Sequence, residues 1–325
     1  MSVTFDTDVL IVGAGPVGMT LAMCLAERHV NCVVLEMKAA DAPREVKCNH
    51  ISARSMEVFR RLGVAQDLRA SGLPDDYPHD VSYRTSTVGR EITRIPIPGR
   101  LTRLTDRSGP DGWWPTPEPP HRLNQRYIEP ILAQHMERHE SIRCLYQHQV
   151  MEIDQDDQGA RVQCQRLTDD AWLDVRARYV VGCDGARSLM RKVLGTTMLD
   201  LGLHQPWLVF DVRLKTEVPS LPDHTVQHCD PARPMTYCNV TGNRRRWEIM
   251  LMPGDDPEQL VQPETLWRLV SQWVTPEQAD IERAFDLLLQ SHLDEHRHRQ
   301  AERNRIEQGD MAAYQSGLLQ LAHSR

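Results

Sequence analysis

The opening of the chain alternates short apolar runs with a glycine-rich turn. Residues 8–12 form an apolar run rich in β-branched side chains, residues 13–18 carry three glycines, and residues 19–29 follow a helical pattern. A second apolar run occupies residues 32–36. This order predicts a strand, a tight turn, a helix and a second, parallel strand joined by a right-handed crossover.

The same patterns predict further elements along the chain. Helical spacing of apolar positions predicts helices over 51–62, 127–138 and 263–274. Short alternating runs predict strands over 143–149, 151–154, 161–166 and 178–183, and a second sheet built from 207–212, 236–240 and 247–251. Proline and glycine throughout residues 71–120 predict connecting or covering structure.

The apolar pattern fades beyond Ile281. Residues 286–290 still contain three leucines, but residues 292–308 are almost wholly charged or amide-bearing. We predict that residues 281–325 form a weakly packed polar helical tail.

Composition places the chain among ordinary globular proteins. Its 325 residues predict about two domains, and 40% apolar with 26% charged residues excludes a disordered or membrane-embedded chain. Lys and Arg number 38 against 45 Asp and Glu, so the net charge of −7 predicts small-molecule partners and no nucleic acid. No run reaches the length of a membrane span. Eight cysteines without a CxxC pair, and an N-terminus without a signal peptide, predict a cytoplasmic protein.

The first turn carries a dinucleotide-binding pattern. Gly13, Gly15 and Gly18 match G-x-G-x-x-G between a predicted strand and a predicted helix, and Glu36 ends the next strand. In this pattern the first glycine permits the turn, the second lets the backbone approach a pyrophosphate, and the third lets helix and strand pack closely. The helix start would hold the phosphates and Glu36 would accept hydrogen bonds from a ribose.

A second motif narrows the choice of dinucleotide. Residues 180–188 read Val-Val-Gly-Cys-Asp-Gly-Ala-Arg-Ser and place Asp184-Gly185 at a strand end. This resembles the Asp-Gly motif of the FAD-dependent aromatic hydroxylases, the single-component flavin monooxygenases. Other segments resemble the same family, namely Pro43-Arg44, 51–63 and 124–129. Over residues 8–274 the chain is most similar to the branch acting on phenolic acids and related phenols, such as the 3-(3-hydroxyphenyl)propionate hydroxylases.

This resemblance implies an α/β fold in which a Rossmann-like FAD-binding domain carries an inserted mixed-sheet substrate domain. The FAD-binding domain would be discontinuous, at residues 1–70 and 100–200. The substrate domain would comprise residues 71–99 and 201–275, and the tail at 281–325 would depart from the family.

The resemblance also implies cofactor-binding roles. The ADP half of FAD would contact Gly13, Gly15, Pro16, Gly18 and Glu36. Arg44 and Gln125 would lie along the flavin, with Arg44 supplying positive charge beside the pyrophosphate. Asp184-Gly185 would contact FAD, with the Asp184 carboxylate accepting hydrogen bonds from ribityl hydroxyls.

The implied activity is hydroxylation of a phenolic compound with NAD(P)H and O2, through a flavin C4a-hydroperoxide. Because the cofactor carries the chemistry, we predict no catalytic side chain and expect an apolar cavity between the two sheets. Candidate lining residues on the second sheet are His228, Met235, Tyr237 and Met250, with His204 and Arg233 as further candidates. The oligomeric state stays open, a homodimer included.

One expected flavin motif is missing. Enzymes of this type carry a second motif, a strand followed by Gly-Asp-Ala and a proline. Gly254-Asp255 lies in a segment that resembles the substrate domain, and Gly309-Asp310 has neither a preceding buried strand nor a following proline. We therefore expect the chain to leave the family near Ile281, as a truncation, a changed reading frame or a fusion would cause. Two alternatives stay open: a non-catalytic remnant that acts through a partner, and a nicotinamide-dependent dehydrogenase.

Two histidine pairs invite a metal-site interpretation. His292 and His296 fit the H-x-x-E-H pattern of zinc peptidases, and His135 and His139 also stand four residues apart. Only 29 residues follow His296, which leaves little chain for a third ligand and a cleft. We expect no metal site.

Overall fold

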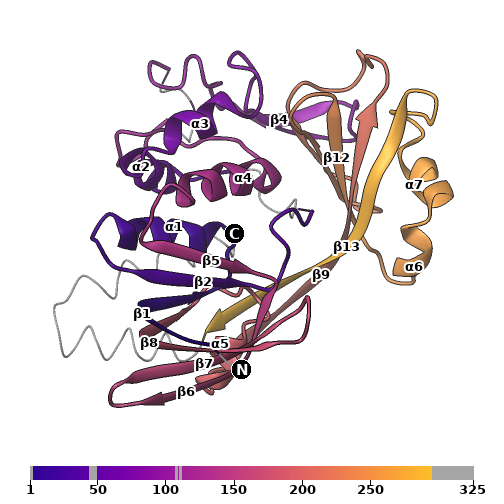
Figure 1. Ribbon diagram of the computed structural model, residues 1–325. Coiled ribbons are helices and arrows are strands. Elements are labelled where there is room, and N and C mark those ends of the chain that lie inside the picture. Colours follow the sequence, from indigo (N-terminus) through magenta and orange to yellow (C-terminus); the bar gives the residue numbers. More distant parts are fainter. Residues whose placement is uncertain (1–2, 44–49, 107–108, 110–111, 295–325) are drawn as a thin grey trace.

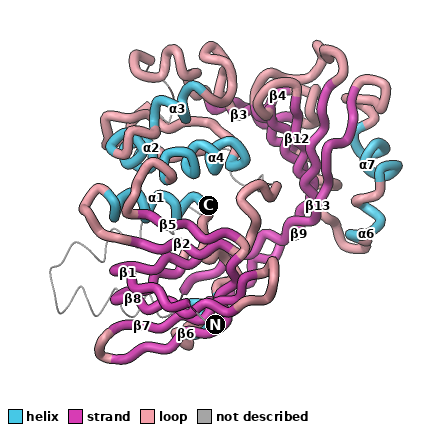
Figure 2. Tube along the Cα trace, in the orientation of Figure 1, coloured by secondary structure: helices cyan, strands magenta, loops and turns pink. Residues whose placement is uncertain are grey.

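Two β-sheets with helices packed against them build the part of the molecule that the structure describes (Figure 1). The structure is a computed structural model that describes residues 3–43, 50–106, 109 and 112–294. Figure 2 shows the two sheets side by side, with strand connections passing between them.

The first sheet is the predicted α/β unit with an antiparallel extension. Its strands are β1 (Val3–Val12), β2 (Cys32–Glu36), β5 (Ile142–Tyr146), β6 (His148–Asp156), β7 (Gly159–Arg166) and β8 (Trp172–Gly182). They are ordered β5-β2-β1-β8-β7-β6, with the first four parallel and the last three antiparallel. Helix α1 (Pro16–Ala26) connects β1 to β2, so the predicted strand–turn–helix–strand order is confirmed.

Among the described residues, four helices cover one face of this sheet. They are α1, α2 (Ala53–Arg61), α3 (Ala65–Ala70) and α4 (Gln125–Met136). Ser52 and Asn124 begin α2 and α4, because each side chain accepts a hydrogen bond from a first-turn amide. The apolar faces of these helices bury Ile11 and Val34 of the strands together with Met56 and Leu132. A second apolar cluster on the other face joins β6, β7 and β8 to the short helix α5 (Leu189–Val193).

The second sheet is mixed and draws its strands from two stretches of the chain. Its strands are β3 (Val81–Arg84), β4 (Glu91–Ile95), β9 (Met198–Leu214), β10 (Thr225–His228), β11 (Met235–Asn239), β12 (Arg244–Met250) and β13 (Ala279–Asp294). The order is β13-β9-β12-β11-β10-β3-β4, and only the β10–β3 pairing is parallel. Short strands β3 and β4 lie in the proline- and glycine-rich stretch that the pattern assigned to covering structure.

Helices α6 (Pro257–Leu260) and α7 (Pro263–Val270) pack on one face of the second sheet. Phe210, Tyr237 and Trp247 project from this face and are fully buried, with Trp247 stacked between Phe210 and Trp273. Side chains of a strand alternate between its two faces, so the neighbours of these aromatic residues point the other way, toward the first sheet.

The predicted helix at residues 281–325 is wrong for its described part, because residues 281–294 continue strand β13. This strand pairs antiparallel with β9 from Ala279–Leu214 to Asp294–Met198, with irregularities near Ile281 and His292. Pairing with a long neighbouring strand satisfies the backbone hydrogen bonds of this segment, whatever the period of its apolar side chains. The local sequence cannot reveal such a pairing, because the partner strand lies elsewhere in the chain. The rest of the predicted tail, with His296 and Gly309-Asp310, lies outside the described residues.

Candidate functional site

The three glycines of the β1–α1 turn meet different structural requirements. Gly13 has φ +103°, and a Cβ there would stand 2.5 Å from the Cys183 carbonyl oxygen. A Cβ on Gly18 would stand 1.9 Å from the Gly13 carbonyl oxygen. A Cβ on Gly15 would meet no protein atom within 4 Å. Gly13 and Gly18 therefore serve the packing of the turn, while Gly15 faces open space that a ligand can enter.

The open space lies at the N-terminus of α1. Gly15 is the N-cap residue and Pro16 the first helical residue, and no side chain caps this helix end. The first-turn amides have no acceptor within the helix, and together with the helix dipole they form a site for an anion such as a diphosphate. The arrangement fits the phosphate end of a dinucleotide.

Glu36, the last residue of β2, is hydrogen-bonded to the same turn. Its Oε2 accepts a hydrogen bond from the amide of Ala14 at 2.8 Å, and its Oε1 accepts one from the amide of Lys38 at 2.9 Å. Each carboxylate oxygen has a further lone pair, so the side chain can also accept hydrogen bonds from a ribose. The backbone thus fixes the carboxylate beside the α1 N-terminus.

Asp184 and Gly185 form a second turn, on the strand next to β1. The Cys183 amide donates to the Val12 carbonyl at 2.7 Å, which holds this turn against the first. Asp184 accepts from the Ser188 hydroxyl at 2.6 Å and from the Leu189 amide at 2.6 Å, so it fastens the start of α5. Gly185 has φ +77°. The predicted contact of Asp184 with the ribityl hydroxyls stays a prediction. Asp184 also shapes the turn through these hydrogen bonds, a role that the motif alone did not reveal.

Of the two residues expected along the flavin, Gln125 belongs to the described part of the chain. Gln125 begins α4, is buried, and its Nε2 donates to the Glu129 Oε1 at 2.6 Å. Arg44 lies outside the described residues.

Three of the four predicted substrate-lining residues face away from the first sheet. Met235 and Tyr237 belong to the core under α6 and α7, and His228 meets the Trp273 ring edge-on at 5.6 Å between centroids. Tyr237 donates its hydroxyl to the Pro222 carbonyl at 3.0 Å and is fully buried. Strand register places these three on the helix-covered face of the sheet, and the prediction that they line the substrate cavity stays a prediction.

Met250 lies on the opposite face, with a group of charged residues that no sequence motif marks. Asp211 and Arg246 form a bidentate ion pair, with Nε–Oδ1 and Nη2–Oδ2 distances of 2.8 and 3.0 Å, and both side chains are at most 5% exposed. Glu248 follows Arg246 on the same face, and burial raises its pKa. The alternation of Arg246, Glu248 and Met250 with buried Trp247 could have identified this face from the sequence.

This charged face borders the first part of the molecule. Arg122, just before α4, donates to the Thr225 hydroxyl of β10 at 3.4 Å. Arg126 of α4 lies 3.5 Å from Glu282 of β13, which also pairs with Arg244 of β12. Residues on this face of the second sheet are therefore the ones placed to meet a ligand held between the two sheets.

Gly254-Asp255 and Arg233 form a structural unit of their own. The Arg233 guanidinium pairs with both carboxylate oxygens of Asp255, at 2.7 and 3.0 Å, and lowers the pKa of Asp255. The Met252 amide donates to the same carboxylate at 2.7 Å. These contacts stabilise the loop after β12, so Arg233 is engaged there rather than on the charged face.

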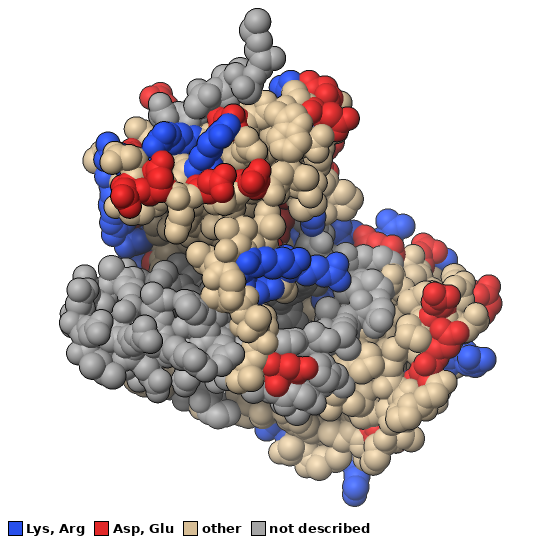
Figure 3. Space-filling model, turned by 90° about the horizontal axis from the view of Figure 1, so that it is seen from below, with Lys and Arg blue, Asp and Glu red and all other residues tan. Residues whose placement is uncertain are grey.

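Metal and surface features add little to the site. No cluster of His, Cys, Asp and Glu suited to a metal ion occurs among the described residues, where His135 instead pairs with Asp67 at 2.6 Å. Within the same part of the chain no helix is both long and apolar enough to cross a membrane. Figure 3 shows basic and acidic side chains interspersed on the face seen from below, without a continuous basic surface.

The known sequences to which this chain is similar include two proteins named as hydroxylases. The chain is 31% identical over 281 residues to a 3-(3-hydroxy-phenyl)propionate/3-hydroxycinnamic acid hydroxylase of Comamonas testosteroni, covering 85% of this chain and 43% of that protein. It is 30% identical to a probable NADH-specific resorcinol 4-hydroxylase of Rhodococcus jostii, covering 87% of this chain and 50% of that protein. The chain thus spans about half the length of the curated relatives it matches.

Solved structures share the fold. The rebeccamycin biosynthetic enzyme RebC, in its substrate-free form, superposes with a TM-score of 0.76 at 28% identity, covering 90% of this chain and 56% of that one. The p-nitrophenol 4-monooxygenase PnpA of Pseudomonas putida has a TM-score of 0.72 at 20% identity, covering 91% and 70%, and supports the fold alone. The predicted Rossmann-like fold with an inserted mixed sheet is confirmed.

A family model described as an FAD binding domain matches residues 6–312. The match runs past Ile281, where the sequence pattern predicted a departure from the family. Because it takes in both turns, both sheets and most of the chain, this protein belongs to the FAD binding domain family.

Proposed function

We propose that this chain binds FAD and forms the flavin- and substrate-facing part of a monooxygenase that hydroxylates a phenolic compound with NAD(P)H and O2. The observation that carries the proposal is the open cradle at Gly15, held beside the Asp184-Gly185 turn on the adjacent parallel strand. The names of the curated relatives support a phenolic substrate, and that of the Rhodococcus relative supports NADH as reductant.

FAD, when bound, supplies the oxygen-transfer chemistry. The first-turn amides of α1 hold its diphosphate and Glu36 accepts hydrogen bonds from its adenosine ribose. The substrate ring packs on Met250, and Glu248 accepts a hydrogen bond from the phenolic hydroxyl. The buried Asp211–Arg246 pair keeps this face of the sheet in one arrangement. We also propose a cytoplasmic location and a homodimer as the assembly.

The direct test is the visible spectrum of the purified protein. We expect a flavin spectrum that survives dialysis, and NAD(P)H oxidation that accelerates when a phenol is added. A flat response across a panel of phenols overturns the assigned reaction. A colourless protein that takes up neither FAD nor NADH favours the non-catalytic remnant, and a colourless protein that takes up no FAD but binds NADH favours the dehydrogenase.

A substitution at Gly15 tests the cradle itself. Gly15 has φ −71°, which any L-residue adopts, so Gly15→Leu should fold while its side chain fills the diphosphate space. We expect at least a hundredfold weaker FAD binding with an unchanged unfolding midpoint. Gln262→Leu, which places the same side chain at the N-cap of α7, is the matched control and should bind FAD like the parent.

A further inference from the structure

Helix α4 belongs to the first sheet by its apolar contacts. Ile128 and Leu132 of α4 are buried in the apolar cluster over the first sheet, and no described residue of α4 belongs to the apolar core of the second sheet. The N-terminal end of α4 nevertheless borders the second sheet, because Arg122, just before the helix, donates to Thr225 of β10. The apolar contacts of α4 therefore do not set its distance from the second sheet.

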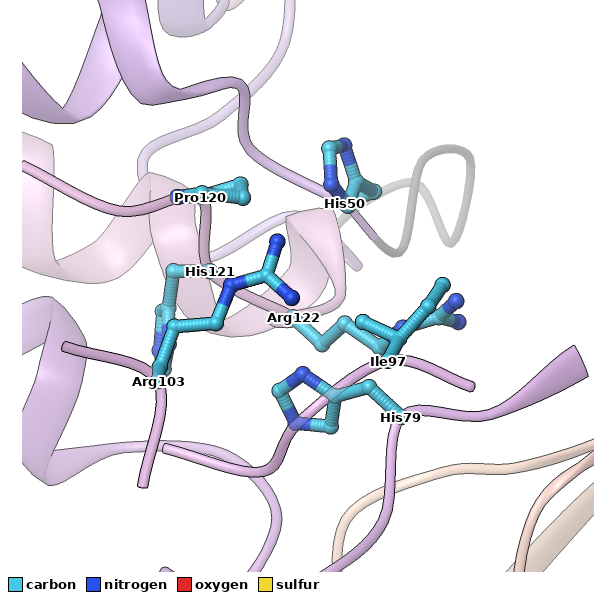
Figure 4. A pocket seen from close by; sticks show the side chains of 7 residues that line it. All are labelled: His50, His79, Ile97, Arg103, Pro120, His121 and Arg122. Carbon is cyan, nitrogen blue, oxygen red and sulfur yellow. The ribbon is translucent and has the colours of Figure 1, made fainter. Parts of the chain in front are cut away.

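The packing at this junction is also incomplete. Figure 4 shows a small, partly open cavity whose lining comes from separate segments of the chain. His121 and Arg122 line it from the segment that leads into α4, and His79 and Ile97 line it from the residues next to β3 and β4. Polar contacts across the junction therefore carry more of the connection than they would between two close-packed surfaces.

One such polar contact joins α4 to two strands of the second sheet. The Glu282 carboxylate on β13 accepts hydrogen bonds from Nε and Nη2 of Arg244 on β12, at 2.7 and 2.9 Å. Its Oε2 also lies 3.5 Å from Nη1 of Arg126 on α4. Strand β9 lies between β12 and β13, so Arg244 reaches across a strand to form its pair. A single carboxylate thus links the helical cover of the first sheet with two strands of the second.

The three side chains of this contact are partly shielded from water. Arg126, Arg244 and Glu282 are 30%, 25% and 26% exposed. Hydrogen bonds from Arg244, together with the charges of Arg244, Arg126 and Arg213, hold the pKa of Glu282 below its usual range, although burial alone would raise it. The carboxylate therefore stays charged at neutral pH, and partial burial reduces the screening of its attraction to Arg126.

The contact lies next to residues of the candidate site on both sides. Arg126 directly follows Gln125, the first residue of α4, which is expected along the flavin. Arg244 lies on the same face of β12 as Glu248, because alternate residues of a strand share a face. The pairing of Arg126 with Glu282 therefore connects the end of α4 that is expected beside the flavin with the strands that are proposed to face the substrate.

We propose that Glu282 is a positioning residue for the hydroxylation. Through Arg126 it holds the N-terminus of α4 at a fixed distance from the second sheet, and so holds the substrate ring at a fixed distance from the flavin. Without this contact, more of the reductant reacts without oxygen transfer to the phenol, as NAD(P)H, H+ and O2 give NAD(P)+ and H2O2. The role in the reaction rests on the proposed function, whereas the link between α4 and the second sheet does not.

The yield of hydroxylated phenol per NAD(P)H consumed by the FAD-loaded full chain tests the role in the reaction. Arg126→Gln cuts only the link to α4, because the Arg244–Glu282 pair stays, and Glu282→Gln removes the whole contact. We expect the yield to fall about two- to fivefold in both variants, the range that a partly exposed ion pair can supply, with the difference appearing as H2O2. FAD affinity and the urea midpoint should stay close to those of the parent. Arg126→Lys keeps the charge and should recover part of the yield.

Asp280→Asn is the matched control on the same strand. Asp280 pairs with Lys215 and Arg213 within the second sheet, so this variant removes ion pairs without touching α4. Its product yield should equal that of the parent. A yield that both Arg126→Gln and Glu282→Gln retain, or that Asp280→Asn loses equally, overturns the proposal. A double variant of Arg126 and Glu282 whose loss is the sum of the single losses also overturns it, because two residues acting through one contact do not add.

Hydrogen exchange tests the link without any turnover. We expect the first-turn amides of α4 to exchange about two- to fivefold faster in Arg126→Gln and Glu282→Gln than in the parent and in Asp280→Asn. Unchanged exchange overturns the link itself. If exchange changes as expected but the parent shows no phenol-stimulated NAD(P)H oxidation, the link stands, while the proposed function and the positioning role fall.

Discussion

The two sheets place their functional groups in different ways. In the first sheet the groups lie in turns at strand ends, where Gly13, Gly18 and Gly185 are needed for steric or backbone reasons. In the second sheet they lie along strands, where adjacent residues such as Trp247 and Glu248 point to opposite faces. A motif therefore identifies a site in the first sheet, whereas only the pairing register identifies one in the second.

The largest loss of stability is expected when the buried ion pair on the charged face of the second sheet is broken. Arg246→Ala leaves the Asp211 carboxylate buried without its partner, which should lower the free energy of unfolding by about 3–5 kcal/mol. The double variant Asp211→Asn with Arg246→Met removes both charges and should lose much less. Urea denaturation of the two variants and the parent measures both. Equal losses in the single and double variants would contradict a buried pair.

A smaller effect is expected at the glycine turn of the first sheet. Gly18→Ala puts a Cβ against the Gly13 carbonyl and forces backbone movement, so we expect a loss of roughly 1–3 kcal/mol. Gly15→Ala, which meets no protein atom, serves as the matched control and should unfold within about 0.5 kcal/mol of the parent. Thermal and urea unfolding report the difference. Similar stability of the two variants would mean that the glycines are not distinguished by packing.

A third variant separates the two faces of the second sheet. Tyr237→Phe removes the hydroxyl that donates to the Pro222 carbonyl and should cost about 1 kcal/mol of stability. Because Tyr237 lies in the core under the helices, the affinity for a phenol should not change. Met250→Ala provides the contrast and should weaken phenol binding. If Tyr237→Phe loses affinity for the phenol, Tyr237 does contact a substrate bound between the sheets.

The smallest effect is a pH dependence at Glu248. Burial raises its folded pKa above the unfolded value, so the folded state binds the proton more tightly and loses stability as pH rises from the unfolded pKa through the folded one. Glu248→Gln lacks this loss, so its stability relative to the parent should increase as the pH rises from 4 to 8. Urea midpoints across this range measure the difference. A constant difference would mean that Glu248 titrates normally.

Local sequence patterns were enough to predict the two turns of the first sheet. The glycine spacing, Glu36 and Asp184-Gly185 are local patterns with few structural solutions, and the βαβ unit that they predict is the one that forms. The mixed second sheet was also foreseen, through the family resemblance. The predicted cofactor contacts of these residues await the measurements proposed above.

For the other residues, the face on which each lies and the partners it meets depend on contacts between distant segments of the chain. Pairing with β9 makes residues 281–294 a strand although their composition favours a polar helix. Register turns His228 and Tyr237 toward α7, and chain segments far apart in the sequence bring His79, Arg103 and His121 around one cavity. The physical reason is that strand pairing and cavity formation depend on contacts between distant segments, whereas a turn depends on the torsion angles of its own few residues.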